Sequence, residues 1–436
     1  MWSRLKRFIG IEWALFKALP RNARILLGTS TLFVFGTPVV SIFISAYIMR
    51  NSHDLVKVMS YQLALYTGVP VMFYLNGLLL RWVKSSVLYA SGLVLTGLSI
   101  FVMTSMTVLT LTGIVLCGLC MGVAIGLHWA NRNLLSLAHT LDRFRNYYFG
   151  IESFFYCVSG VLMPAAIGLF IVWYGNAREP DAGANRAYRI IAAGVVALAL
   201  CASGIVLRGT FGKTSVPAGS RVRYDKAWRG LLLLAALKGI TQVFQSCLPA
   251  MLVMRLLGGR ENALGAIQSA AALGAALLMY LIGRNTKPGH RLGLLSAALL
   301  LYAAGAVVNA SFFNSWSMLF FIGALSVSQP LTEWAMAAIQ MQVIDGAVAR
   351  EKGSGYTYLC GYEWALYGGR MLGGGAFVLV ASEFSGDSAL RYVLAAVALV
   401  QLLSIPITRA VMGFLREQNF GFEDTHGAVY SEHVDA

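Results

Sequence analysis

The sequence contains few charged residues for its length. Asp, Glu, Lys and Arg make up 12% of the 436 residues, whereas hydrophobic residues make up 58% and the mean hydropathy is +0.68. An average soluble domain carries roughly 25% charge, so this composition excludes a water-exposed surface over most of the chain. The apolar residues form repeated runs of roughly 18 to 26 residues, and about 20 such residues cross the core of a bilayer. The composition therefore predicts an integral membrane protein.

The sequence also lacks the short motifs of several enzyme classes. It contains no GxxxxGK[ST] loop for nucleotide phosphates, and no HExxH or GxSxG motif. The formal net charge is +15, but Lys and Arg lie between apolar runs rather than on one solvated face. This distribution argues against nucleic-acid binding. We therefore expect no enzyme, no cofactor and no nucleic-acid partner.

Cysteine is scarce, and none of it lies in a polar stretch. Such cysteines behave as small hydrophobic residues. Two of them form a CxxC, but a second ligand pair is missing, so we expect no metal site. The six cysteines are Cys117, Cys120, Cys157, Cys201, Cys247 and Cys360.

The first residues of the chain are basic and amphipathic. Trp2, Phe8 and Trp13 can share one helical face while Arg4 and Lys6 reach anionic head groups. The segment 1–24 is therefore predicted to lie on the membrane surface, and a disordered basic tail is the alternative.

Twelve apolar runs are predicted to cross the membrane, six on each side of a basic stretch. The first six lie near 25–49, 57–80, 86–106, 108–131, 149–173 and 190–207, and the second six near 231–253, 263–283, 292–310, 316–342, 356–381 and 390–411. The predicted units are an N-terminal bundle at 25–207, a linker at 208–230, a C-terminal bundle at 231–411 and a tail at 412–436.

The positions of Lys and Arg predict the orientation. If both termini are cytoplasmic, basic residues on that side outnumber those on the other by about three to one. We therefore expect a multi-pass protein of the cell membrane, specifically a bacterial inner membrane. Both termini and the linker are expected to lie in the cytoplasm.

The two halves share a faint internal repeat. His128-Trp129-Ala130 stands before Gly150 as Glu333-Trp334-Ala335 stands before Gly355. Duplicated halves around a central site are the pattern of transporters.

Two six-helix halves with a basic linker resemble the Major Facilitator Superfamily over essentially the whole chain. More narrowly, Asn131–Phe155 and Gly361–Gly375 are similar to the YqgE-type branch of that superfamily. The loop after the second span departs from the usual pattern, since Gly77, Arg81 and Lys84 are present without the acidic residue. The resemblance implies an all-α membrane fold of two pseudo-symmetric bundles, with the fourth and tenth helices lining a central path.

Charged residues inside a bilayer are expensive unless paired or hydrated, so each is a candidate functional residue. Glu363 and Arg370 are seven residues apart and share one face of the eleventh span, but are too separated for an i,i+4 ion pair. Their functional interpretation is substrate binding or proton coupling. The alternative is a structural network that joins two helices.

The tenth and seventh spans carry further candidates. Pro330 is expected to interrupt the tenth helix, which favours a cavity-facing Glu333 beside Trp334. Lys238 and Gln242 form a polar stripe on the seventh span, with cavity lining and packing as the two interpretations.

His128, Trp129, Asn131 and Arg132 form the densest polar group of the first half. His128 opposite Glu333 is an attractive pair of half-sites, because histidine titrates in the range needed for proton coupling. A solvated cluster at the inner end of the helix is the alternative. Glu152 starts the fifth span as either a buried or an interfacial carboxylate.

These observations predict a secondary active transporter that moves a small polar or charged organic solute by alternating access, coupled to protons. We expect it to act as a monomer in the lipid bilayer. An efflux antiporter for amphiphilic compounds and a non-transporting receptor or assembly protein are the alternatives. The residues expected to bind substrate or carry coupling are His128, Arg132, Lys238, Glu333, Glu363 and Arg370, supported by Trp129, Asn131, Glu152, Gln242 and Trp334.

Overall fold

The computed structural model describes residues 16–140, 142–176, 180–212, 224–285, 291–351 and 355–417. Within these ranges the chain forms helices and no strands. Most of the predicted surface segment, central linker and C-terminal tail lies outside the described residues, at 1–15, 213–223 and 418–436.

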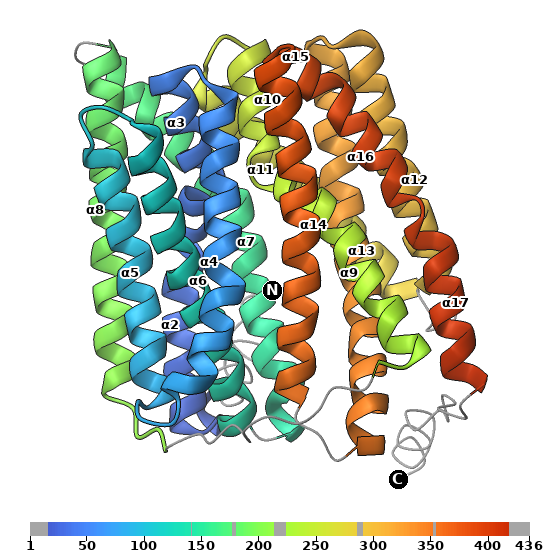
Figure 1. The fold of residues 1–436 in the computed structure, drawn as a ribbon. Coiled ribbons are helices and arrows are strands. Elements are labelled where there is room, and N and C mark those ends of the chain that lie inside the picture. The colour runs from blue at the N-terminus through green and yellow to red at the C-terminus, as the bar shows by residue number, and fades with distance from the viewer. Residues whose placement is uncertain are drawn as a thin grey trace, which may run out of the picture.

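The N-terminal half is the blue to green bundle in Figure 1. Its first segment is made of three helices that continue one another, and the others are single helices. The helices are α2 (Arg21–Pro38), η1 (Val39–Phe43), α3 (Ile44–Ser52), α4 (Leu55–Leu79), α5 (Ser85–Ser105), α6 (Leu111–His139), α7 (Asp142–Asn176) and α8 (Pro180–Leu207).

The C-terminal half is the yellow to red bundle of Figure 1, and its first and last segments are again divided. The helices are α9 (Lys226–Gln245), α10 (Leu248–Leu256), α11 (Glu261–Asn285), α12 (Arg291–Phe312), α13 (Ser315–Glu351), α14 (Gly355–Glu383), α15 (Gly386–Ser388), η3 (Ala389–Val393), α16 (Leu394–Gln401) and α17 (Ser404–Glu417).

Taken with their continuations, these helices make twelve segments in the described part of the chain, and nine of them are long and apolar enough to cross a membrane. The other three are α4, α13 and α14. Several helices begin before the predicted spans, such as α2 at Arg21, α9 at Lys226 and α7 at Asp142. The reason is that a helix can extend beyond the apolar run into the polar boundary.

Prolines divide some segments but not the one where a break was expected. Pro38 precedes the π-helical turn η1, and Pro249 starts α10 after the break at Ser246. In contrast, α13 runs without interruption through Pro330, so the predicted break is wrong. Proline removes one backbone hydrogen bond, and a helix held by its neighbours tolerates that loss.

Small residues bring one helix pair in each half into close contact. A Cβ on Gly122 of α6 would collide with the carbonyl oxygen of Leu65 in α4. In the C-terminal half, a Cβ on Gly369 of α14 would collide with the carbonyl oxygen of Ala236 in α9. Backbones that approach this closely are typical of membrane helix pairs.

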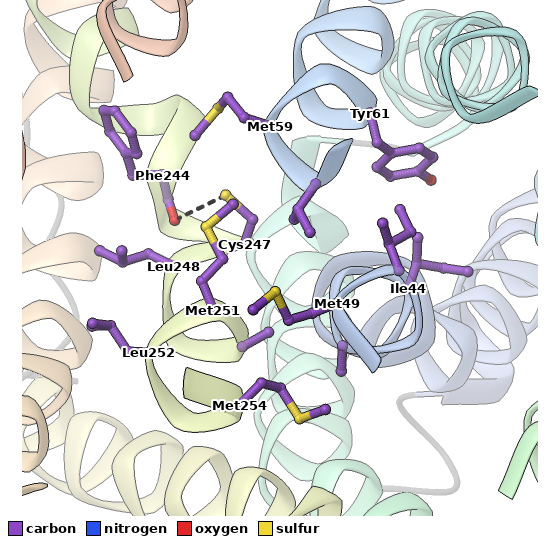
Figure 2. Close-up of a cluster of buried hydrophobic side chains, with 14 of the residues drawn as sticks. Ile44, Met49, Met59, Tyr61, Phe244, Cys247, Leu248, Met251, Leu252 and Met254 are labelled. Atoms are coloured by element: carbon purple, nitrogen blue, oxygen red, sulfur yellow. Dashed lines mark hydrogen bonds between the residues drawn. The ribbon is translucent and has the colours of Figure 1, made fainter. Parts of the chain in front are cut away.

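We call the face that carries the chain ends Leu207 and Lys226 the linker face, and the other end of the bundle the opposite face. Near the opposite face the two halves meet through buried apolar side chains. Figure 2 shows this contact, with Met49 and Met59 of the N-terminal half facing Cys247 and Met251 of the C-terminal half. Methionine suits such a contact because its flexible thioether fills irregular gaps.

A buried ion pair also joins the halves near the opposite face. The Arg50 side chain donates to Glu261 over 2.6 Å, and only 4% of the Glu261 side chain is exposed. Beside it, α7 and α11 pack closely, and the backbone N–H of Ala165 donates to the Ser269 hydroxyl over 2.9 Å. The molecule is therefore closed between its halves on this side.

Candidate functional site

A cavity of about 410 Å³ lies between the two halves. It opens toward the linker face, where the exposed residue Asn133 of α6 is part of its wall. Helices of both halves contribute to it. The lining residues are Val40, Ser41, Gln62, Leu65, Tyr66, Val69, Phe73, Ile125, Trp129, Asn133, Gln242, Ser246, Glu363 and Arg370.

Arg370 of α14 is held rigidly in the cavity wall. Its Nε and Nη2 donate to the same oxygen, Oε1 of Gln242 in α9, over 3.1 and 2.7 Å. The guanidinium carbon lies 4.4 Å from the centre of the Tyr66 ring, a distance suited to a cation–π contact. Only 5% of the Arg370 side chain is exposed. Two of the predicted residues, Arg370 and Gln242, are thus brought together.

Glu363 lies two helical turns before Arg370 on α14. Its Oε2 is 3.6 Å from Nη1 of Arg370, which is an ion pair but longer than a hydrogen bond. The sequence interpretation that these residues are too far apart for a direct pair is therefore wrong. Both side chains are long, so together they span the two turns that separate their Cα atoms.

Lys238 and Glu333 form a second charge pair behind the cavity. The Lys238 ammonium donates to Oε2 of Glu333 over 2.5 Å, joining α9 to α13. The Glu333 side chain is 39% exposed and neither residue lines the cavity.

Arg132 and Glu152 make a closed pair inside the N-terminal half. The Arg132 guanidinium bonds both carboxylate oxygens of Glu152, and the Ser30 hydroxyl donates to Oε1 over 2.5 Å. Arg132 also lies over the rings of Trp129 and Phe149 at 5.6 and 5.3 Å. Glu152 is buried rather than interfacial, because α7 begins at Asp142 and places it well inside the helix.

His128 does not face Glu333. Its ring stacks on Phe33 at 3.8 Å, and both of its nitrogens are buried without a hydrogen-bond partner among the described residues. The expected pair of half-sites is therefore absent from this arrangement. The reason is the rotation of α6, which turns Trp129 rather than His128 toward the cavity.

Asn131 forms hydrogen bonds with two neighbouring helices. Its amide nitrogen donates to Asn76 of α4 over 2.6 Å, and its oxygen accepts from Ser85 of α5 over 2.9 Å. The residue ties three helices of the N-terminal half together away from the cavity. Trp334 and Trp364 are 41% and 45% exposed and also do not line the cavity.

Most of the lining residues were not singled out from the sequence, and several of them lie on α4. Gln62 and Tyr66 lie four residues apart on α4, so they share a helical face, and Phe73 continues it seven residues later. A polar residue and a tyrosine at this spacing within an apolar run are the signal by which the sequence could have identified this face.

The helix arrangement and the cavity between the halves define an all-α membrane fold of two helical bundles. Solved structures of transporters share this fold at low sequence identity. A POT family transporter in complex with 5-aminolevulinic acid matches with a TM-score of 0.67 at 12% identity, covering 90% of this chain and 97% of that one. The nucleoside transporter NupG matches with a TM-score of 0.63 at 13% identity, covering 90% and 99%.

Among individual sequences, the chain is similar to an uncharacterized protein, YqgE of Bacillus subtilis (strain 168). The two are 22% identical over 422 residues, which is 94% of this chain and 90% of that protein. No family model matches the chain. The narrower resemblance to the YqgE-type branch stays a prediction.

Proposed function

We propose that the chain is a secondary active transporter that moves a small polar or charged organic solute by alternating access. The observation that carries this proposal is the cavity between the halves, closed toward the opposite face and lined by Arg370, Glu363 and aromatic side chains. Such a cavity is the expected site of a solute in a fold whose two halves rock about their interface. The arrangement corresponds to the state open to the linker face.

The structural neighbours support a polar organic solute. One is a transporter of nucleosides, and another holds 5-aminolevulinic acid. The basic residues on the linker face support an orientation with both termini in the cytoplasm. We assign the protein to a cell membrane, as in a bacterial inner membrane, with the monomer as the working unit, since the cavity is complete within one chain.

Proton coupling is assigned to the acidic residues of the C-terminal half. Glu363 lies in the cavity wall and Glu333 lies behind it, paired with Lys238. Binding a proton to either carboxylate weakens an ion pair and changes the balance of charge between the halves. This gives a gradient of protons a way to bias the direction in which the bundle opens.

The test uses the purified protein in liposomes that contain an internal pH dye, screened with pools of metabolites. We expect one pool to drive proton movement in the wild type and Glu333→Gln or Glu363→Gln to abolish it. The exposed pair of Arg255 and Asp387 supplies a control, because Asp387→Asn leaves the cavity untouched. If no pool moves protons and both variants complement the wild type in cells, the chain is not a proton-coupled transporter.

The outcome of the screen also separates the other candidate functions. Proton movement driven by many unrelated amphiphilic compounds would indicate an efflux antiporter. If both variants complement the wild type in cells and no transport is detected, the chain would be a receptor or assembly protein on the same scaffold.

A further inference from the structure

We propose that the cavity binds a zwitterion, a small solute that carries both a carboxylate and an ammonium group. The carboxylate would bind Nη1 of Arg370 and the ammonium Oε2 of Glu363. This inference rests on the proposed function and deepens it by naming the substrate class.

The first argument is the set of hydrogen bonds that the cavity leaves unmade. Nη1 of Arg370 and Oε2 of Glu363 are buried, and neither has a hydrogen-bond partner among the described residues. Buried polar atoms are almost always satisfied, and leaving them unpaired is unfavourable. One donor and one acceptor remain on the same wall, which suits a ligand with one acidic and one basic group.

The second argument is the balance of charge. Arg370 and Glu363 are the charged residues that line the cavity, and they have opposite signs. The neighbouring Lys238 and Glu333 also cancel. A simple carboxylate bound to Arg370 would leave Glu363 without a partner in a buried site, and a simple amine would do the same to Arg370. A zwitterion provides a partner of opposite charge for both Arg370 and Glu363.

The third argument is the fixed direction of the guanidinium group. Gln242 occupies Nε and Nη2 of Arg370, and Tyr66 lies against the guanidinium plane. Nη1 is thereby the donor left for a ligand, and its orientation is set before binding, which favours affinity. Trp129, Tyr66 and Phe73 line the same cavity and offer an aromatic surface to the rest of the solute.

The assignment separates the tasks of the two carboxylates. If Glu363 holds the ammonium of the solute, Glu333 is the residue left to carry the coupling proton. Glu363→Gln then weakens binding, whereas Glu333→Gln uncouples transport from the proton gradient.

The test measures ligand-induced shifts of the unfolding temperature for the full chain in detergent. The ligands are L-phenylalanine, 3-phenylpropanoate, which lacks the ammonium, and 2-phenylethylamine, which lacks the carboxylate. An aliphatic set follows with L-leucine, 4-methylpentanoate and 3-methylbutylamine. We expect an amino acid to stabilise the wild type at concentrations at least about tenfold lower than either partial analogue, as the loss of one partner of a buried charge pair implies.

The variants should separate the two ends of the ligand. Arg370→Gln is expected to lose the difference between the amino acid and the amine, and Glu363→Gln the difference between the amino acid and the carboxylate. Arg255→Gln, in the exposed pair with Asp387, is the control and should respond like the wild type. If Glu363→Gln does not fold, Glu363→Asp replaces it and should reduce the same difference, because its shorter side chain withdraws the carboxylate from the ammonium group.

Two results would overturn the inference. One is equal stabilisation by amino acids and their partial analogues, and the other is no stabilisation by any member of either set. If the liposome screen finds a different solute whose movement depends on Glu333, the zwitterion inference fails while the proposed function stands. If that screen is also negative, both fail.

Discussion

The two halves of the molecule bury their charges in different ways. In the N-terminal half, the guanidinium of Arg132 bonds both carboxylate oxygens of Glu152, and the Ser30 hydroxyl donates a further hydrogen bond to Oε1. In the C-terminal half, Nη1 of Arg370 and Oε2 of Glu363 face each other at 3.6 Å, and neither atom makes a hydrogen bond to a described residue. Glu152 and Arg370 are equally buried, with 4% exposure each.

Burial alone therefore does not identify a functional charge in this protein. The proposal rests instead on unmade hydrogen bonds at the cavity wall, because a closed pair has no free donor or acceptor for a ligand, whereas Arg370 and Glu363 each keep one there. Under the proposed function, the Arg132–Glu152 pair stabilises the N-terminal half and the Glu363–Arg370 pair binds the ligand.

The largest expected effect comes from breaking the closed pair. Glu152→Ala leaves the Arg132 guanidinium buried with no carboxylate, and we expect it to lower the free energy of unfolding by about 3 kcal/mol or more. Denaturation of the purified protein in detergent, followed by intrinsic fluorescence, measures this change.

The matching variant in the other half is Glu363→Ala. Because the Glu363–Arg370 contact is longer and Gln242 still holds the guanidinium, we expect its effect on stability to be the smaller of the two. Asp387→Asn, in an exposed pair, should change stability by about 1 kcal/mol or less. Equal losses for Glu152→Ala and Glu363→Ala would contradict the comparison.

A second prediction concerns the close helix pair in each half. Gly122→Ala and Gly369→Ala each drive a methyl group into a neighbouring backbone, and we expect each to lower stability by about 1 to 3 kcal/mol. Gly369 adjoins Arg370 itself, whereas Gly122 contacts the cavity wall only through the backbone of Leu65, so Gly369→Ala should weaken solute uptake by the liposomes more than Gly122→Ala.

The control for this pair of variants is Gly368→Ala, since a Cβ at Gly368 would meet no atom within 4 Å. It should behave like the wild type in both assays. If Gly122→Ala reduces uptake as much as Gly369→Ala at the same loss of stability, the cavity depends on the two helix pairs equally and the proposed division of roles is wrong.

Much of the fold was predictable because a membrane-spanning segment can be recognised in the sequence from the length of its apolar run. The all-α fold with apolar spans agrees with this prediction. The break at Pro330 was not observed, since α13 continues as one helix from Ser315 to Glu351. The sequence of a helix shows where its polar residues and prolines lie, but not how neighbouring helices pack against it.

The candidate site was predictable in part for the same reason. Arg370, Glu363, Gln242 and Trp129 do line the cavity, as a search for polar residues in apolar runs suggested. The prediction that His128 lies opposite Glu333 was wrong, because the rotation of each helix about its axis depends on how it packs against the other helices. Residue spacing places side chains on a common face without showing what that face meets.

The smallest expected effect comes from the ion pair that joins the two halves. Arg50→Ala removes the partner of Glu261 near the opposite face. Because the Arg50 side chain is 20% exposed, water can take its place, so the closed contact there should weaken by about 1 kcal/mol, or about fivefold in a two-state equilibrium. Cys247 reports this change, since its side chain is fully buried between the halves beside Met49 and Met251 (Figure 2).

A variant that keeps Cys247 as its single cysteine allows labelling with a membrane-impermeant maleimide. Labelling should accelerate about fivefold in Arg50→Ala, because opening at the opposite face exposes the thiol. The control is Arg391→Ala, where the lost contacts go to Ala310 and stay within the C-terminal half. Equal labelling rates in the two variants would show that the contact between the halves is held by the apolar cluster alone, and that the charged groups near this face, unlike those at the cavity, take no part in opening.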